Sequence, residues 1–219
     1  MTGTARRSAV AGLALAATLG LAGCGSDGPG RAADGNTACD GVVRTDHAGA
    51  LMDAAAAPAY KLDKQLDAAQ QPGLQLLACT AEAKQGLGVD VRLTGSETPG
   101  GGLQAPAPPA GEPVYSLGFG DRSAVTRWGA RLTFRCDGTY GKSGKPLYFT
   151  VQAAPFAATG GTPQTPPASW TPEAWARLAT DSARRAATGP LGCTAPVAWP
   201  SGAPALAAAS APAPSGTGA

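Results

Sequence analysis

The residue runs 130–136, ARLTFRC, and 147–153, LYFTVQA, decide the fold class, because each alternates apolar and polar side chains. A period of two residues is the pattern of a half-buried β-strand, whose side chains point alternately to the two faces of a sheet. A polar, glycine-containing loop at 137–145 separates the two runs. They therefore predict an antiparallel hairpin with one face in a hydrophobic core.

The N-terminal half of the chain is predicted to add short helices and strands to this hairpin. Thr45 stands at the N-cap position of a helix that Pro58 would end or kink, and residues 60–70 read as a second short helix. Three more strands are predicted, at residues 74–81, 87–94 and, more weakly, 114–119, and the same alternation of side chains is present in the run 87–94.

The clearest helix signal begins at Thr171, which is followed by Pro172 at the first helical position and by Glu173 near the positive end of the helix dipole. Gly189 is expected to end this helix. Its apolar positions, spaced by three and four residues, form one stripe that should face the sheet: Trp175, Leu178, Ala179, Ser182 and Ala186.

Residues 38–199 are therefore expected to form an α+β domain, with an antiparallel sheet of four to five strands, helices packed on one face and two disulfides. Two cystine-linked half-domains are the alternative. Residues 200–219 are almost entirely Ala, Pro, Gly, Ser and Thr without charge, so this tail is predicted to be disordered. Charged residues make up only 15% of the chain, which excludes a coiled coil.

The first residues have the organisation of an export signal. Arg6 and Arg7 provide a positive region, and residues 8–22 form an uncharged apolar run that is shorter than the ~20 residues of a transmembrane helix. Residues 21–24, LAGC, resemble the bacterial lipobox, in which the cysteine thiol receives a diacylglyceryl group. An ordinary secretory signal, or twin-arginine export through Arg6 and Arg7, is the alternative.

This leader predicts where the protein resides. Residues 1–23 are expected to be a cleaved lipoprotein signal peptide, and Cys24 to carry diacylglyceryl and a further fatty acid such as palmitate. Residues 24–37 would form a lipidated tether that holds the domain at the extracytoplasmic face of the cell membrane. Removing the two leader arginines leaves equal numbers of basic and acidic residues, so no nucleic-acid partner is predicted.

The remaining four cysteines are expected to form disulfides, because an even count outside the cytoplasm is typical of an oxidised protein. Four cysteines allow three pairings. We favour Cys39 with Cys79 and Cys136 with Cys193, because each bridge then joins the outer end of a helical segment to a strand in the same half of the chain. The chain has no CxxC spacing and a single histidine, so neither a metal site nor another cofactor is predicted.

Candidate catalytic residues are few. The run Gly141-Lys142-Ser143 lacks the earlier glycine of a phosphate-binding loop, since Cys136 occupies that position. His47 could act with a nearby aspartate, but it lies in the first turn of a predicted helix, where a solvated histidine is common, and no G-x-S-x-G elbow is present. No catalytic residue is therefore predicted; a hydrolase that depends on His47 is the least favoured alternative.

A basic strip is the strongest candidate for a contact surface. Residues 121–145 carry an excess of positive charge on an otherwise neutral mature protein. Within it, Arg127, Arg131 and Arg135 could face an anionic wall polymer, lipid headgroups or an acidic patch on a partner. A solvated strand face without a partner is the competing interpretation.

The lipobox, the four cysteines and the closing run 191–193, LGC, together resemble small actinobacterial surface lipoproteins, over most of residues 21–194. That group includes a streptomycete lipoprotein encoded beside an envelope-stress sigma factor and its two-component sensor system. The resemblance implies a non-enzymatic modulator, of negative sign, of envelope-stress signalling, whose partner is the extracytoplasmic domain of a sensor kinase. The alternative function is a binding module for an anionic cell-wall polymer or a small ligand.

Overall fold

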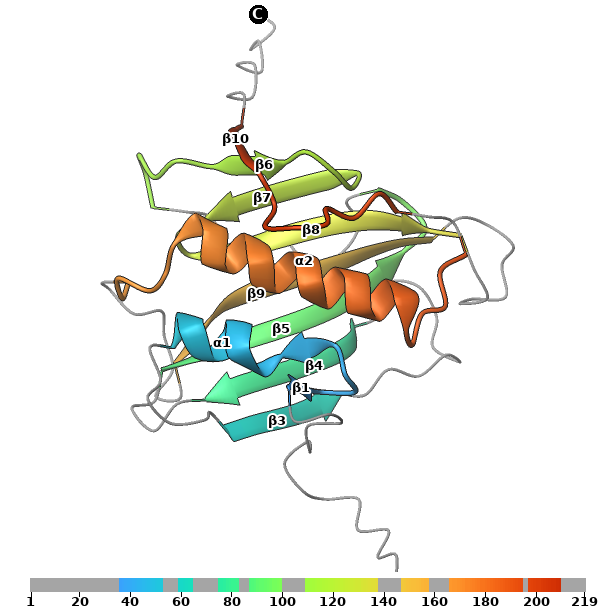
Figure 1. The fold of residues 1–219 in the computed structure, drawn as a ribbon, viewed down its shortest axis with the longest axis horizontal. Helices are drawn as coiled ribbons and strands as arrows, with labels where there is room; N and C mark the ends of the chain where they lie inside the picture. Colours follow the sequence, from blue (N-terminus) through green and yellow to red (C-terminus); the bar gives the residue numbers. More distant parts are fainter. Residues whose placement is uncertain are drawn as a thin grey trace, which may run out of the picture.

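A single antiparallel sheet of eight strands is the framework of the protein (Figure 1). The computed structural model describes residues 36–52, 59–64, 75–82, 87–99, 109–137, 147–157, 166–194 and 197–209. Within them, the strands lie in the order β10-β6-β7-β8-β9-β5-β4-β3. The α+β class and the antiparallel sheet are therefore confirmed, but the sheet is larger than the four to five strands predicted from the sequence.

The sheet consists of two meanders that meet where β5 pairs with β9. The first meander runs through β3 (Ala59–Lys64), β4 (Gln75–Glu82) and β5 (Leu87–Ser96). The second runs through β6 (Tyr115–Leu117), β7 (Arg122–Thr126), β8 (Gly129–Cys136) and β9 (Leu147–Ala157). Strands β8 and β9 form the predicted hairpin, in the register Leu132 to Val151 and Phe134 to Phe149. Both halves of the chain therefore share one continuous sheet.

The tight turn between β7 and β8 depends on a glycine. Only Arg127 and Trp128 separate the two strands, and Gly129 has a φ of 142°, which L side chains rarely adopt. A Cβ atom at this position would lie 2.6 Å from the carbonyl oxygen of Ala153 on β9. The hydroxyl of Thr126 also accepts a hydrogen bond from the Trp128 N–H at 3.0 Å, which closes the turn.

Helix α2 (Pro172–Thr188) lies across one face of the sheet and packs on β8 and β9 (Figure 1). Its predicted start is confirmed, because the Thr171 side chain accepts a hydrogen bond from the Ala174 N–H at 3.2 Å and Pro172 occupies the first turn. All five residues of the predicted stripe are buried. Within the described residues, no helix is long and apolar enough to cross a membrane.

Helix α1 (Thr45–Leu51) lies on the same face of the sheet and packs against α2. It follows a small ribbon formed by β1 (Thr37–Ala38) and β2 (Val43–Arg44). The sequence placed Thr45 at the N-cap, whereas the structure has Arg44 there without a capping side-chain bond, and Thr45 is the first helical residue. The expectation that helices cover one face of the sheet is confirmed for these two helices.

The core lies between this face of the sheet and the helices. Phe134 and Phe149 are fully buried on neighbouring strands, with ring centroids 6.0 Å apart. Trp170 packs edge-to-face against both Trp128 and Trp175, at centroid distances of 5.9 and 5.6 Å. Such edge-to-face pairs stabilise a core beyond the area they bury. The aromatic cluster therefore fixes the approach of the chain into α2.

Two disulfides close the domain, and both join the cysteines that were paired from the sequence. Cys39, in the turn between β1 and β2, is bonded to Cys79 of β4. Cys136, the last residue of β8, is bonded to Cys193, four residues beyond the Gly189 cap of α2. The second bridge therefore ties the C-terminal end of α2 to the sheet.

The segment predicted as a second short helix at 60–70 is instead strand β3 over its first part. Its backbone pairs with β4, in the register Tyr60 to Ala81 and Leu62 to Cys79. The remaining residues of that prediction lie outside the described residues. The helical interpretation was wrong. So short an alternating run is compatible with the period of a strand and with that of a helix, and pairing with β4 makes it a strand.

The prediction of a disordered tail from residue 200 is also wrong for its first ten residues. Leu206–Ala208 form β10, which pairs with β6 and covers that edge of the sheet. Just before it, Trp199 packs edge-to-face on Phe119 and Phe134, with centroid distances of 6.1 and 5.4 Å. An anchored aromatic ring and a free sheet edge therefore order a segment whose composition alone predicts disorder. Residues 210–219 lie outside the described residues.

Candidate functional site

The predicted basic strip is divided between two places in the structure. Leu132 and Phe134 are buried toward the helices, so the alternation of β8 places Arg131 and Arg135 on the opposite face of the sheet. Arg127 lies in the turn between β7 and β8, where its carbonyl oxygen accepts a hydrogen bond from the Trp175 indole at 3.0 Å. The structure therefore brings Arg131 and Arg135 onto one surface and leaves Arg127 at the end of the strands.

Arg122 of β7 takes the place of Arg127 in this group. It pairs in register with Thr133, two residues from Arg131 on β8, and diagonal neighbours of this kind have Cβ atoms about 7–8 Å apart. Burial lowers the pKa of Arg131, and the positive charge of Arg122 lowers it further. We name the surface made by Arg122, Arg131 and Arg135 the arginine face.

The third member of the arginine face, Arg135, is paired with an acidic residue. The Arg135 Nε donates to the Asp137 carboxylate at 2.9 Å, and this hydrogen bond raises the pKa of Arg135. Between the arginines, Thr133 and Thr150 form a buried cross-strand pair with hydroxyl oxygens 2.9 Å apart. The face therefore consists of long cationic side chains above a row of buried hydroxyls.

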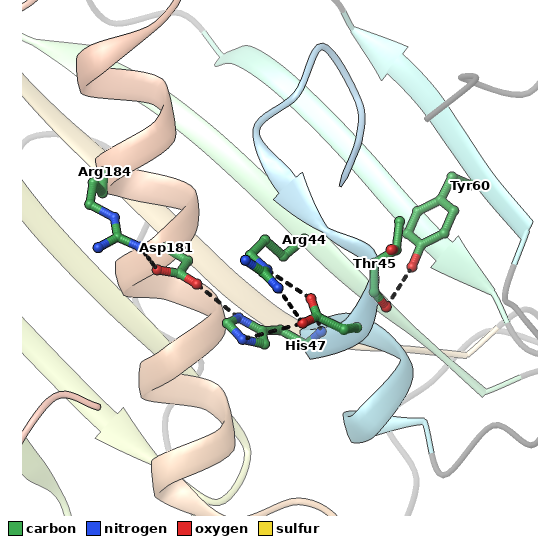
Figure 2. Close-up of polar contacts among 7 residues, drawn as sticks. Arg44, Thr45, His47, Tyr60, Asp181 and Arg184 are labelled. Carbon is green, nitrogen blue, oxygen red and sulfur yellow. Dashed lines mark hydrogen bonds and ion pairs between the residues drawn. The ribbon is translucent and has the colours of Figure 1, made fainter. Parts of the chain in front are cut away.

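A second polar cluster joins α1 to α2 (Figure 2). His47 Nδ1 lies 3.1 Å from an Asp181 carboxylate oxygen, and His47 Nε2 lies 3.9 Å from the Asp46 carboxylate. Arg184 donates to Asp181 at 2.5 Å, one helical turn along α2, and Arg44 donates to Asp46 at 2.8 and 2.5 Å. The single histidine therefore lies between two carboxylates, each of which also has its own arginine.

The position of His47 differs from the solvated histidine expected from the sequence. Its side chain is only 17% exposed, because α2 packs against this side of α1. The sequence assigned Asp181 and Arg184 to intrahelical pairing, and that pairing is present. What the sequence did not indicate is that Asp181 also contacts a histidine 134 positions earlier in the chain.

Charge and burial shift the pKa values of three side chains in this cluster, Asp46, Asp181 and Tyr60. The hydrogen bonds from Arg44 are the largest influence on Asp46 and lower the pKa of its carboxyl to about 2. Burial opposes ionisation of Asp181, but the hydrogen bond from His47 and the charge of Arg184 outweigh it, so the pKa of Asp181 is lowered. Burial, with a contribution from Asp46, raises the pKa of Tyr60 to about 12; its hydroxyl donates to the Thr45 carbonyl at 3.2 Å.

A pocket of about 230 Å³ opens beside this cluster. One wall is α2, with Arg177, Thr180, Asp181 and Arg184, and His47 of α1 contributes next to them. The other wall is the C-terminal segment 200–204, ahead of β10. Cationic and hydroxyl side chains therefore line a recess on the helical side of the protein, away from the arginine face.

No metal chemistry is indicated by the side chains that the structure describes. Among those residues, no group of three or more His, Cys, Asp or Glu side chains is placed to hold a metal ion. The lipidation candidate Cys24 and the run 141–143 lie outside the described residues. The chemistry that the described clusters can perform is recognition of charged groups.

The comparisons with known proteins leave the family of this chain open. No protein-family model matches it, no curated protein matches it, and no solved structure matches it.

Acid should weaken the contact between α1 and α2. Because the pKa values of Asp46 and Asp181 are lower in the folded protein, the folded state binds fewer protons than the unfolded chain in acid. Their stabilisation is complete above about pH 4 and is lost as the pH falls, to about 2 for Asp46. Asp46 is half-exposed, so solvent screening limits its share to less than about 1 kcal/mol.

Urea unfolding of an Asp181→Asn variant tests this dependence. The variant should be about 1 kcal/mol less stable than the parent at pH 7, where the carboxylate contacts His47 and is paired with Arg184, and its stability should fall less than that of the parent between pH 4 and pH 2. Asp137→Asn is the control, because it changes an equally polar but exposed ion pair with Arg135 and should cost distinctly less. Equal losses of unfolding free energy in the two variants would contradict the conclusion that Asp181 contributes more to stability than an exposed ion pair.

Proposed function

We propose that the protein is a lipid-anchored, extracytoplasmic and non-enzymatic modulator of envelope-stress signalling, which acts by binding the extracytoplasmic domain of a sensor kinase. The observation that carries the proposal is the arginine face, which lies on the side of the sheet opposite α1 and α2. The expected partner surface is acidic, because it must neutralise the charges it meets.

The energetics of Arg122 and Arg131 favour an anionic partner. These guanidinium groups repel each other, and Arg131 is also partly desolvated, as its lowered pKa reflects. A carboxylate placed between them relieves the repulsion and forms charge-assisted hydrogen bonds, which are the stronger class of protein hydrogen bond. Positive charge concentrated on one face of a neutral protein also accelerates encounter with an acidic surface.

The two disulfides support an extracytoplasmic location. Disulfides form and persist in oxidising compartments, and here they tie both halves of the sheet to the elements that precede or follow it. Together with the predicted lipidation of Cys24, the disulfides support a position of the domain close to the outer surface of the membrane, within reach of a membrane-embedded partner.

The surroundings of His47 support a non-enzymatic role. A histidine acting as general base needs one ring nitrogen directed toward a reacting group. Both ring nitrogens of His47 face carboxylates of Asp46 or Asp181, which suits a histidine that holds two helices together. No nucleophile is needed to explain the cluster.

A complementation experiment tests the proposed function. Deletion of the gene should change an envelope-stress transcript several-fold, and the Arg122→Glu/Arg131→Glu double variant should fail to restore it. Arg127→Glu is the control, because it makes the same kind of charge reversal at a single position in the neighbouring turn and should restore the transcript. Cys24→Ala should release the protein from the membrane fraction and also fail to complement.

Binding measurements separate the two candidate partners. In the native host's membrane extract, the mature protein should capture the sensor kinase, and the double variant should capture at least about tenfold less. Retention on purified cell-wall polymer, lost in the same variant and without kinase capture, would replace the proposal with a polymer-binding module. A double variant that restores the transcript would contradict any function of the arginine face.

A further inference from the structure

The pocket beside α2 has the charge of an anion site. Each of its neighbouring carboxylates is already matched by an arginine, since Asp46 is bonded to Arg44 and Asp181 to Arg184. Arg177, two turns before Arg184 on the same side of α2, lines the pocket and forms no ion pair within the described part of the chain. The pocket therefore has a cation in excess of its acids, even with His47 neutral.

A buried hydroxyl at the same place points to a missing acceptor or donor. Thr180 lines the pocket beside Arg177, is only 4% exposed, and its Oγ1 atom is buried without a hydrogen-bond partner among the described residues. A buried polar atom without a partner costs about 1–3 kcal/mol. A rotation about χ1 of Thr180 would bring this hydroxyl to the pocket wall, where an oxygen-bearing ligand would remove the cost, because a hydroxyl both donates and accepts.

The opposite wall of the pocket contributes a further hydroxyl side chain that can contact such a ligand. Ser201 and Gly202 belong to the short connection between Trp199, which is anchored on Phe134, and strand β10. Both residues are exposed and line the pocket, so Ser201 adds a hydroxyl side chain to this wall. The volume of about 230 Å³ is several times that of one water molecule, about 30 Å³ in the liquid.

We propose that this pocket binds a small oxyanion, a phosphate or carboxylate group, through the Arg177 guanidinium and the hydroxyls of Thr180 and Ser201. Asp181 remains paired with Arg184 and in contact with His47, which fixes the α2 wall of the pocket against α1. The site is on the helical side of the sheet and does not require the arginine face, so this inference stands apart from the proposed function.

Titration calorimetry and backbone amide NMR of the disulfide-bonded mature protein test the site. The probes are inorganic phosphate and acetate, with potassium chloride at matched ionic strength as the reference for screening. Either oxyanion should bind saturably and shift the amide signals of residues 177–184 and 200–204. Tighter binding of phosphate identifies a phosphate ligand, and tighter binding of acetate a carboxylate ligand. Shifts with both anions that match those in chloride would overturn the proposal.

Three variants locate the binding. Arg177→Glu should weaken it by more than about tenfold, and Thr180→Val, which keeps the side-chain shape, by about fivefold or more. Arg131→Glu, on the other face of the sheet, should bind as the parent does. Thermal unfolding verifies that each variant is folded. Unchanged affinity in folded Arg177→Glu, or equal loss in Arg131→Glu, would show that the anion is not held in this pocket.

Discussion

Replacing Cys136 and Cys193 together by alanine should lower the free energy of unfolding by about 4 kcal/mol. The bridge closes a stretch with a sequence separation of 57, so its removal enlarges the conformational freedom of the unfolded chain. It also frees the end of α2, where the Cys193 N–H donates to the Ala187 carbonyl at 2.9 Å. Urea unfolding under oxidising conditions, with far-UV circular dichroism as the signal, measures the loss.

The second bridge provides the control for this experiment. Cys39→Ala/Cys79→Ala removes a bridge of sequence separation 40 and should cost a similar amount, because loop entropy grows slowly with length. Adding a thiol reductant to the parent removes both bridges and should therefore lower its stability below that of either variant. A loss below about 1 kcal/mol in both variants would show that neither bridge constrains the unfolded chain in the way we infer.

Replacing Trp170 by alanine should cost about 3–5 kcal/mol. Its indole is 1% exposed and packs edge-to-face against Trp128 and Trp175. Its N–H also donates to the Leu51 carbonyl at 3.0 Å, which satisfies the C-terminal end of α1. The substitution therefore removes packing between the helices and the sheet at the place where the chain enters α2.

A second substitution separates volume from hydrogen bonding at this position. Trp170→Phe keeps most of the ring but loses the N–H, so it should cost distinctly less than alanine. Thermal and urea unfolding give the two differences in free energy. If phenylalanine costs as much as alanine, the hydrogen bond to Leu51 outweighs the packing, and the account of the aromatic cluster given above is wrong.

The elements predicted well are those in which local pattern and tertiary packing agree. Strand β8 alternates over its whole length, and α2 combines a capping threonine, an N-terminal proline and an apolar stripe. Each of these signals is produced within one segment. The cysteine pairing was predicted from a different signal, the order of the expected elements along the chain, which favoured one of the three possible pairings.

The elements that were missed depend on their neighbours. Strand β7 ends in the turn Arg127-Trp128, which lacks the Asn-Gly or Asp-Gly signature of a two-residue hairpin. Strand β3 has too few alternating residues to distinguish strand from helix, and β10 exists because β6 offers a free edge. Hydrogen bonds to a partner strand formed these segments, and no local pattern indicates such a partner.

The candidate sites were foreseen only where strand alternation places residues on one face. Arg131 and Arg135 share a face because they are two residues apart in β8, and this could be predicted. Arg122 joins them through strand pairing, and Asp181 meets His47 through helix packing. Contacts between distant segments depend on the tertiary fold, and the local patterns of one sequence do not reveal them.

The first disulfide determines how mechanical force enters the domain. A pull on the chain ahead of residue 36 first loads the ribbon of β1 and β2, where the Asn36 carbonyl accepts a hydrogen bond from the Thr45 N–H at 3.0 Å, and then passes from Cys39 through the sulfur bridge into β4. That strand is paired on both sides, with β3 and with β5, so extracting it requires shearing two ladders at once. Once this ribbon has opened, helix α1 and the cluster around His47 lie beyond the bridge, and most of the force bypasses them. Tension applied through the N-terminal tether is therefore resisted mainly by the strand pairing of the sheet, and less by the contacts between the helices.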